Sequence, residues 1–147
     1  MTEELFRKAF TIYGGNFDRA GESSTEIKEI LKGLHLDSSI IRRSVIVAFE
    51  AEMNVVMYAN VASLNFIITD EDICFEIFDK GPGIADIEQA MQEGFSTASD
   101  EMREMGFGFG MGLPNIKKNS DALVIESEVG IGTKLSASIR LNPDGSP

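Results

Sequence analysis

The chain has 147 residues, 43% hydrophobic and 25% charged, a composition that excludes a disordered or fibrous protein. Its 24 acidic and 13 basic residues give a net charge of −11, which argues against binding to nucleic acid or an anionic membrane. A chain of this length can bury one core, so we expect a single domain over residues 1–147.

The cysteine content and the N-terminal residues indicate a cytoplasmic protein. The single cysteine, Cys74, excludes an intrachain disulfide and fits a reducing compartment. The first residues lack the apolar segment of a secretory signal, and no apolar run reaches the roughly 20 residues of a membrane-spanning helix.

The N-terminal part of the sequence predicts one strand and two helices. Residues 6–13 suit an edge strand that ends at two glycines, and Asn16 or Asp18 can cap the helix that follows. Asp37 is a good N-cap for a longer helix that reaches about residue 59. The first helix is predicted from apolar residues at helical spacing, namely Ile27, Ile30, Leu31 and Leu34.

The middle of the sequence predicts a hairpin and a short helix. Residues 64–69 and 73–78 have the pattern of two strands, and the polar turn at residues 70–72 joins them. Residues 87–91 suit a short helix. Residues 94–112 show no apolar period and predict a loop.

The C-terminal part predicts a short helix and a second hairpin. Residues 113–120 suit a helix with Pro114 in its first turn, where the missing N–H costs little. Residues 123–127 and 134–141 suit strands, and the turn-rich tail at 142–147 is expected to fray. Because the strands come mostly as hairpins, the element order predicts an α+β two-layer sandwich with helices on one face of the sheet.

Two glycine-rich segments are candidates for a ligand site. Gly81 and Gly83 follow Asp79 directly after an apolar strand, and residues 106–112 carry glycine at alternate positions before a helix. Glycines let backbone N–H groups approach a ligand, and such a turn at a helix N-terminus suits an anion. The alternative is that both segments are only turns.

The common phosphate-binding motifs do not fit these glycines. The sequence lacks the Gly-Lys-Ser/Thr ending of a Walker A loop, and the spacing in residues 106–112 is not that of the dinucleotide-binding pattern G-x-G-x-x-G. A eukaryotic-type kinase needs a His-Arg-Asp loop, whereas the only histidine, His35, precedes Leu36.

Glu50 and Asn54 lie four residues apart in the second predicted helix and therefore share one face. A carboxylate can deprotonate an attacking hydroxyl, and an amide oxygen can ligate Mg²⁺. The alternative is a solvated helix face on which Glu50, Glu52 and Asn54 are all exposed.

Three segments in this order resemble the N, G1 and G2 boxes of the Bergerat-fold ATPases, which include gyrase, heat-shock chaperones, histidine kinases and mismatch-repair ATPases. The segments are Glu50-x3-Asn54, Asp79-x-Gly81-x-Gly83 and Gly108-x-Gly110-x-Gly112. Their flanking residues are similar to those of the bacterial anti-sigma factor serine/threonine kinases, the switch kinases of partner-switching pathways above all. The resemblance covers about residues 16–141 and implies a mixed, mostly antiparallel sheet.

The resemblance also implies a role for each residue of the boxes. Glu50 matches the catalytic base, and Asn54 matches the Mg²⁺ ligand. Asp79 matches the carboxylate that accepts a hydrogen bond from the adenine amino group. Gly81 and Gly83 match the turn that lets adenine lie flat.

The implied ATP lid covers about residues 94–112, and Thr133 matches a hydroxyl that helps to fix adenine, often through water. Arg103 is a candidate phosphate contact, whereas Lys117 and Lys118 suit solvated positions. The remaining residues expected to contact the nucleotide are Ile84, Gly108, Gly110, Met111, Gly112 and Leu113.

The family implies an ATP- and Mg²⁺-dependent serine/threonine kinase. Its substrate would be a STAS-type anti-anti-sigma protein, it would bind a sigma factor or another regulator, and such kinases are often homodimers. The sequence departs from the family in a longer lid segment, residues 98–105, and in residues 61–63, where members often carry glycine or histidine. Two alternatives stay open, an ATP-gated binding module with little kinase activity and a domain whose glycines are only turns.

Overall fold

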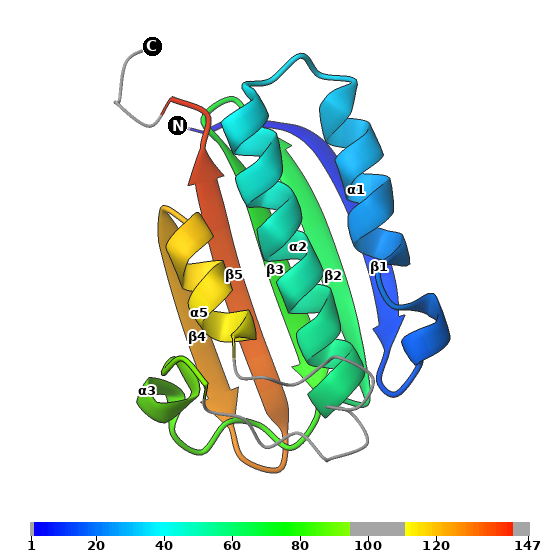
Figure 1. Cartoon of the computed structure of the whole chain (residues 1–147), viewed down its shortest axis with the longest axis vertical. Helices are drawn as coiled ribbons and strands as arrows, with labels where there is room; N and C mark the ends of the chain where they lie inside the picture. The colour runs from blue at the N-terminus through cyan, green and yellow to red at the C-terminus, as the bar shows by residue number, and fades with distance from the viewer. Residues whose placement is uncertain (1, 95–110, 143–147) are drawn as a thin grey trace.

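A five-stranded sheet carries helices on one of its faces (Figure 1). The computed structural model describes residues 2–94 and 111–142. The elements in chain order are β1 (Glu4–Tyr13), the 3-10 turn η1 (Phe17–Arg19), α1 (Glu22–Lys32), α2 (Ser38–Tyr58), β2 (Val61–Thr69), β3 (Asp72–Lys80), α3 (Ile87–Ala90), α5 (Gly112–Asn119), β4 (Ala122–Glu128) and β5 (Gly132–Arg140).

The strand order is β1-β2-β3-β5-β4, which confirms the predicted α+β architecture. All four neighbouring pairs of described strands are antiparallel, so the sheet differs from the mixed sheet that the resemblance implied. Two of the pairs, β2–β3 and β4–β5, are hairpins, which are antiparallel by construction. The two hairpins then meet along β3 and β5, which also run antiparallel.

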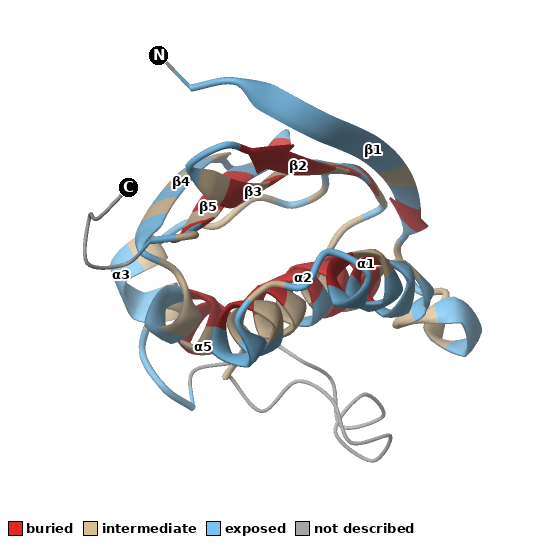
Figure 2. Ribbon diagram, turned by 90° about the horizontal axis from the view of Figure 1, so that it is seen from above, coloured by how far each residue is buried: buried red, intermediate tan, exposed pale blue. Residues whose placement is uncertain are grey.

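The core lies between the sheet and the helices, where Figure 2 shows the buried residues. Alternation along β3 buries Ile73, Phe75 and Ile77 and leaves the intervening side chains on the other face. The central helix α2 packs its apolar side against this sheet and also contacts both α1 and α5. Within the described residues, no helix combines the length and the apolar character needed to cross a membrane.

The predicted cap of the long helix is confirmed, whereas the cap of the first helix is not. Asp37 accepts a hydrogen bond from the Ser39 N–H at 2.9 Å at the start of α2. Asn16 makes no side-chain cap hydrogen bond, and Asp18 lies inside η1. Helix α1 begins only after Gly21, which adopts a φ of 95°.

A carboxylate from α2 takes the place of a local cap on α1. Glu52 is 2% exposed and accepts the N–H groups of Gly21 and Ser23 at 3.1 and 3.3 Å through Oε2. Its other oxygen, Oε1, accepts the Ser24 N–H at 3.0 Å. The free N–H groups of a helix N-terminus stabilise such a charge. The solvated-face alternative is therefore wrong for Glu52, which ties α1 to α2.

Replacing Glu52 tests the strength of this tie. Glu52→Ala leaves three backbone N–H groups without their charged acceptor, and we expect a loss of about 2–4 kcal/mol in the free energy of unfolding. Urea unfolding followed by circular dichroism measures it. The control is Glu29→Ala, at an exposed position of α1, which should cost less than about 0.5 kcal/mol. A loss for Glu52→Ala no larger than the control's would contradict this role.

Candidate functional site

Glu50 lies where α2 faces the N-terminal turn of α5. A Cβ atom at Gly112 would stand 3.2 Å from Glu50 Oε2, so the glycine leaves room for the carboxylate. The Asn115 side chain in α5 hydrogen-bonds the same carboxylate. Asn54 lies one helical turn further along α2 and is partly buried, as is Glu50. The exposed-face alternative is therefore wrong for these two residues as well.

Burial raises the pKa of Glu50 above its ordinary value, and the hydrogen bond from Asn115 acts in the opposite direction. A carboxylate with a raised pKa accepts a proton more readily than a solvated one, which suits a general base. The sequence alone does not single out Asn115. Its only signal is a polar side chain three residues after Gly112, within the first turns of a short helix.

Asp79 lies at the end of β3, directly opposite Thr133 of β5. Its Oδ1 accepts the backbone N–H of Thr133 at 3.0 Å, and within the described residues no hydrogen bond reaches Oδ2. Burial raises the pKa of Asp79, and the bond from Thr133 opposes this shift. The carboxylate is thus fixed by one oxygen and can receive a ligand with the other.

The turn after Asp79 is held against the β4–β5 hairpin. The Gly81 N–H donates to the Ile131 carbonyl at 3.3 Å, and the Gly130 N–H donates to the Pro82 carbonyl at 2.9 Å. Gly83 has a φ of 75°, and a Cβ atom there would lie 2.4 Å from the Glu128 carbonyl oxygen. The glycine at this position is therefore required by both its conformation and the close approach of the hairpin.

Ser127 of β4 is a residue of the site that the motifs did not identify. Its Oγ accepts the N–H of Ile84 at 2.7 Å and lies 2.9 Å from Thr133 Oγ1. Ser127 is also directly opposite Thr133 in the hairpin. The predicted adenine residues Asp79, Ile84 and Thr133 are thus joined in one hydrogen-bonded group. The cross-strand position of Ser127 is the signal that pairing the two predicted strands could have supplied.

The described end of the predicted lid lies at the start of α5. Met111 is the N-cap residue and is partly buried, and Gly112 begins the helix. Leu113 is 7% exposed and its side chain packs in the core, so the predicted nucleotide contact can come only from its backbone. Lys118 is exposed and pairs with Glu93, as expected for a solvated lysine. The predictions for Gly108, Gly110 and Arg103 lie outside the described residues.

The donor set fits a magnesium ion that is held mainly by its nucleotide. No group of three or more acidic, histidine or cysteine side chains converges on a metal position within residues 2–94 and 111–142. Mg²⁺ typically uses one or two protein oxygens and completes its octahedral shell with phosphates and water. The amide oxygen of Asn54, one helical turn from Glu50, is an oxygen donor of the kind that Mg²⁺ uses.

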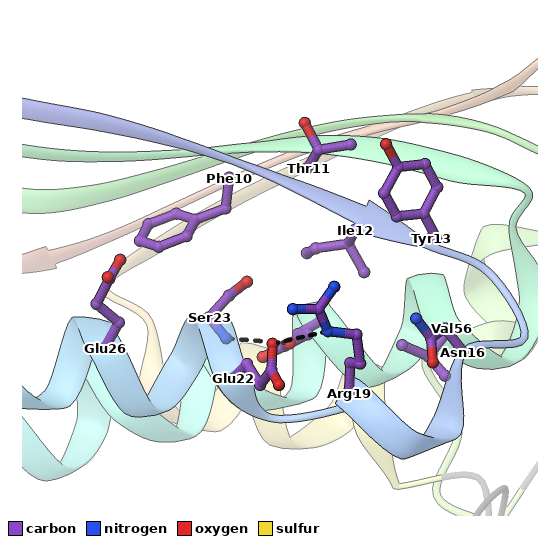
Figure 3. A pocket seen from close by; sticks show the side chains of 11 residues that line it. Phe10, Thr11, Ile12, Tyr13, Asn16, Arg19, Glu22, Ser23, Glu26 and Val56 are labelled. Atoms are coloured by element: carbon purple, nitrogen blue, oxygen red, sulfur yellow. Dashed lines mark hydrogen bonds and ion pairs between the residues drawn. The ribbon is translucent and has the colours of Figure 1, made fainter.

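A separate cavity of about 280 Å³ lies on the other flank of α2, between β1 and α1 (Figure 3). None of the residues predicted to bind nucleotide lines it. Its charged groups already have partners in the chain, because Arg19 pairs with Glu22 at 3.2 Å and Glu52 caps α1. This cavity is not the predicted nucleotide site.

Substitution of Gly83 tests the close contact between the turn and the hairpin. Gly83→Ala forces a Cβ atom against the Glu128 carbonyl, and we expect a loss of about 2–4 kcal/mol in the free energy of unfolding. The matched control is Gly130→Ala, because Gly130 has a φ of 83° but no atom within 4 Å of the added Cβ. It should cost only the backbone strain, about 1 kcal/mol. Equal losses for the two variants in urea unfolding would contradict the contact.

Substitution of Asn115 tests the coupling of α5 to Glu50. Removing the amide donor in Asn115→Ala destabilises the carboxylate, so the pKa of Glu50 should rise further. Carboxyl ¹³C chemical shifts recorded across a pH titration measure this change. Asn119→Ala is the control, since Asn119 donates to the Asn115 carbonyl and not to Glu50. An unchanged or lowered pKa in Asn115→Ala would rule out the proposed bond.

Known proteins similar to this chain include anti-sigma factors and a protein kinase. The chain is 28% identical over 133 residues to the anti-sigma F factor of Caldanaerobacter subterraneus subsp. tengcongensis, covering 90% of this chain and 81% of that protein. The anti-sigma F factor of Geobacillus stearothermophilus is 28% identical over 131 residues, covering 89% and 79%. The serine/threonine-protein kinase RsbT of Bacillus subtilis is 41% identical over 59 residues, covering 40% and 38%.

The same relationship extends over the whole site. The family model described as histidine kinase-, DNA gyrase B-, and HSP90-like ATPase matches residues 41–143, which is more than half of the chain. This range contains both carboxylates, the glycine turn and the β4–β5 hairpin. The chain is similar to the anti-sigma F factors and to the kinase RsbT, and it therefore belongs, by this match, to the histidine kinase-, DNA gyrase B-, and HSP90-like ATPase family.

Proposed function

We propose that this protein binds Mg-ATP and transfers the γ-phosphoryl group to a serine or threonine hydroxyl of a partner protein. The observation that carries the proposal is a pair of partly buried carboxylates in different surroundings. Asp79 is fixed by the Thr133 N–H beside a glycine turn, and Glu50 faces the N-terminal turn of α5. The Asp79 carboxylate suits a hydrogen bond with the edge of a nucleobase. The Glu50 carboxylate suits the deprotonation of a reacting hydroxyl.

Adenine binds at the end of the site formed by Asp79, Gly81, Gly83 and Thr133. The free oxygen of Asp79 accepts a hydrogen from the adenine amino group. Gly83 packs closely against the hairpin and has no side chain, so the turn leaves space for the flat adenine ring. The raised pKa of Asp79 reflects burial, and a hydrogen-bond donor from the base compensates for it.

The phosphates lie at the N-terminus of α5. The free N–H groups and the dipole of this helix attract negative charge, and Gly112 allows the phosphates to come close to the backbone. The Asn54 amide oxygen would hold a Mg²⁺ ion that arrives with ATP, and this ion would supply charge neutralisation at the phosphates. The net charge of −11 makes a metal-bound nucleotide a better ligand than the free anion.

Glu50 acts as the general base. It accepts the proton of the substrate hydroxyl, whose oxygen forms a bond to the γ-phosphorus while the bond to the β-phosphate oxygen breaks and ADP leaves. Phosphoryl transfer depends mostly on positioning and on electrostatic stabilisation, so one base, one metal ligand and a helix N-terminus are sufficient. The hydrogen bond from Asn115 orients the carboxylate for this step.

The proposed biological role follows from the relatives and the resemblance. Relatives that are called anti-sigma F factors support a regulator that binds a sigma factor or a similar target, and the kinase RsbT supports phosphoryl transfer. We take a STAS-type anti-anti-sigma protein as the substrate, a homodimer as the assembly, and the cytoplasm as the location.

The test separates phosphoryl transfer from nucleotide binding. Glu50→Ala should lower transfer of labelled phosphate to the cognate partner by 100-fold or more, while the Kd for Mg-ATP in isothermal titration changes by only a few-fold. Asp79→Asn is the opposite control and should weaken ATP binding at least tenfold. Undiminished transfer by Glu50→Ala would remove Glu50 from the role of base. ATP binding by the unaltered protein without any transfer would instead favour the ATP-gated binding module.

A further inference from the structure

Three polar side chains form a row across adjacent strands at one end of the sheet. Asp79 of β3 is opposite Thr133 of β5, and Thr133 is opposite Ser127 of β4. In the register, the same row continues to Ala62 and Ile12, which are buried under the helices. The three polar side chains therefore lie on the helix-covered face, where the base is proposed to bind.

The contacts of Ser127 determine the direction of its hydrogen bonds. Its Oγ accepts the Ile84 N–H at 2.7 Å and lies 3.1 Å from the Gly132 carbonyl oxygen. A carbonyl oxygen can only accept, so the single proton of Ser127 is used there. The third contact, to Thr133 Oγ1 at 2.9 Å, then requires Thr133 to be the donor. Ser127 thus accepts two hydrogen bonds and donates one, which is the full capacity of a hydroxyl group.

We propose that Ser127 is a positioning residue that fixes the Thr133 hydroxyl as a hydrogen-bond acceptor toward the base. The proposal rests on the proposed function, because it concerns the base of the bound nucleotide. With its proton directed to Ser127, Thr133 Oγ1 presents only lone pairs to a ligand. Asp79 Oδ2 also presents only lone pairs, so two acceptors face the same edge of the base.

Two fixed acceptors select a base by the group at its 6-position. The 6-amino group of adenine has two hydrogens to donate, whereas a 6-oxo group of a purine has lone pairs that both acceptors repel. A hydroxyl that could rotate would lose this selectivity, since it could donate to the 6-oxo group. Discrimination by unpaired or repelling polar groups is effective in a partly buried site.

The backbone geometry supports a hydroxyl that does not rotate. The hairpin carrying Ser127 and Thr133 is joined to the glycine turn by hydrogen bonds of Gly81 and Gly130, and Gly83 leaves no room for displacement. The Ile84 N–H holds Ser127 from the turn side. Ser127 therefore contacts both the segment after the glycine turn, through Ile84, and strand β5, through Thr133.

The experiment compares the Kd values of Mg-ATP and Mg-ITP, which differ at the 6-position of the base, for the full chain and its variants. Ser127→Ala should lower the ratio of Kd for ITP to Kd for ATP about tenfold, because it frees the Thr133 hydroxyl to donate. Ser127→Thr keeps a hydroxyl and should retain the ratio. Ser136→Ala is the matched control, since Ser136 lies on β5 but opposite Val124, on the face without helices, and should change neither Kd.

Each outcome decides the question. A lowered ratio in Ser127→Ala together with a retained ratio in Ser127→Thr supports the proposal. The proposal is overturned if the ratio is unchanged in Ser127→Ala. It is also overturned if the affinities for ATP and ITP fall equally or are both abolished, because Ser127 then has only a structural role. Failure of the unaltered protein to bind Mg-ATP would refute the proposed function itself, which is a different result.

Discussion

The constraint on which the structure depends is that the central helix α2 carries polar side chains on two flanks. Glu52 points to α1 and receives three backbone N–H groups there. Glu50 lies against α5 and receives one side-chain hydrogen bond. Glu52 thus accepts three backbone hydrogen bonds in a structural role, whereas Glu50 keeps capacity for a ligand. This asymmetry within three residues separates the two roles.

Burying the carboxylates of Glu50 and Asp79 lowers the folding stability of the protein when no ligand is bound. Burial raises the pKa of both Glu50 and Asp79, so the folded chain holds their protons more tightly than the unfolded chain does. Folding stability is therefore lost as the pH rises from the unfolded-state pKa through the higher folded-state pKa of each group. The ionised form of each group carries this penalty. A magnesium ion near Glu50 and a donor at Asp79 would offset the penalty on binding.

The sequence predicts those elements whose residue pattern is compatible with only one local structure. The apolar spacing, the cap at Asp37 and the hairpins predicted the layers. The order of the three boxes predicts that their side chains share one site, and this stays a prediction. The sequence could not locate the start of α1, because the cap comes from Glu52, 31 residues away. No short motif encodes the contacts of Asn115 and Ser127, although pairing the two predicted strands could have placed Ser127 opposite Thr133.

The pairing of β3 with β5 has a consequence for the order in which the protein acquires its site. Asp79 is fixed by Thr133, which belongs to the last described strand in the chain. A nascent chain that has emerged only as far as α5 already contains Glu50, Asn54 and the glycine turn, but it lacks the hairpin that holds this turn. The contacts that fix Asp79 and the glycine turn therefore form only after β5 has left the ribosome.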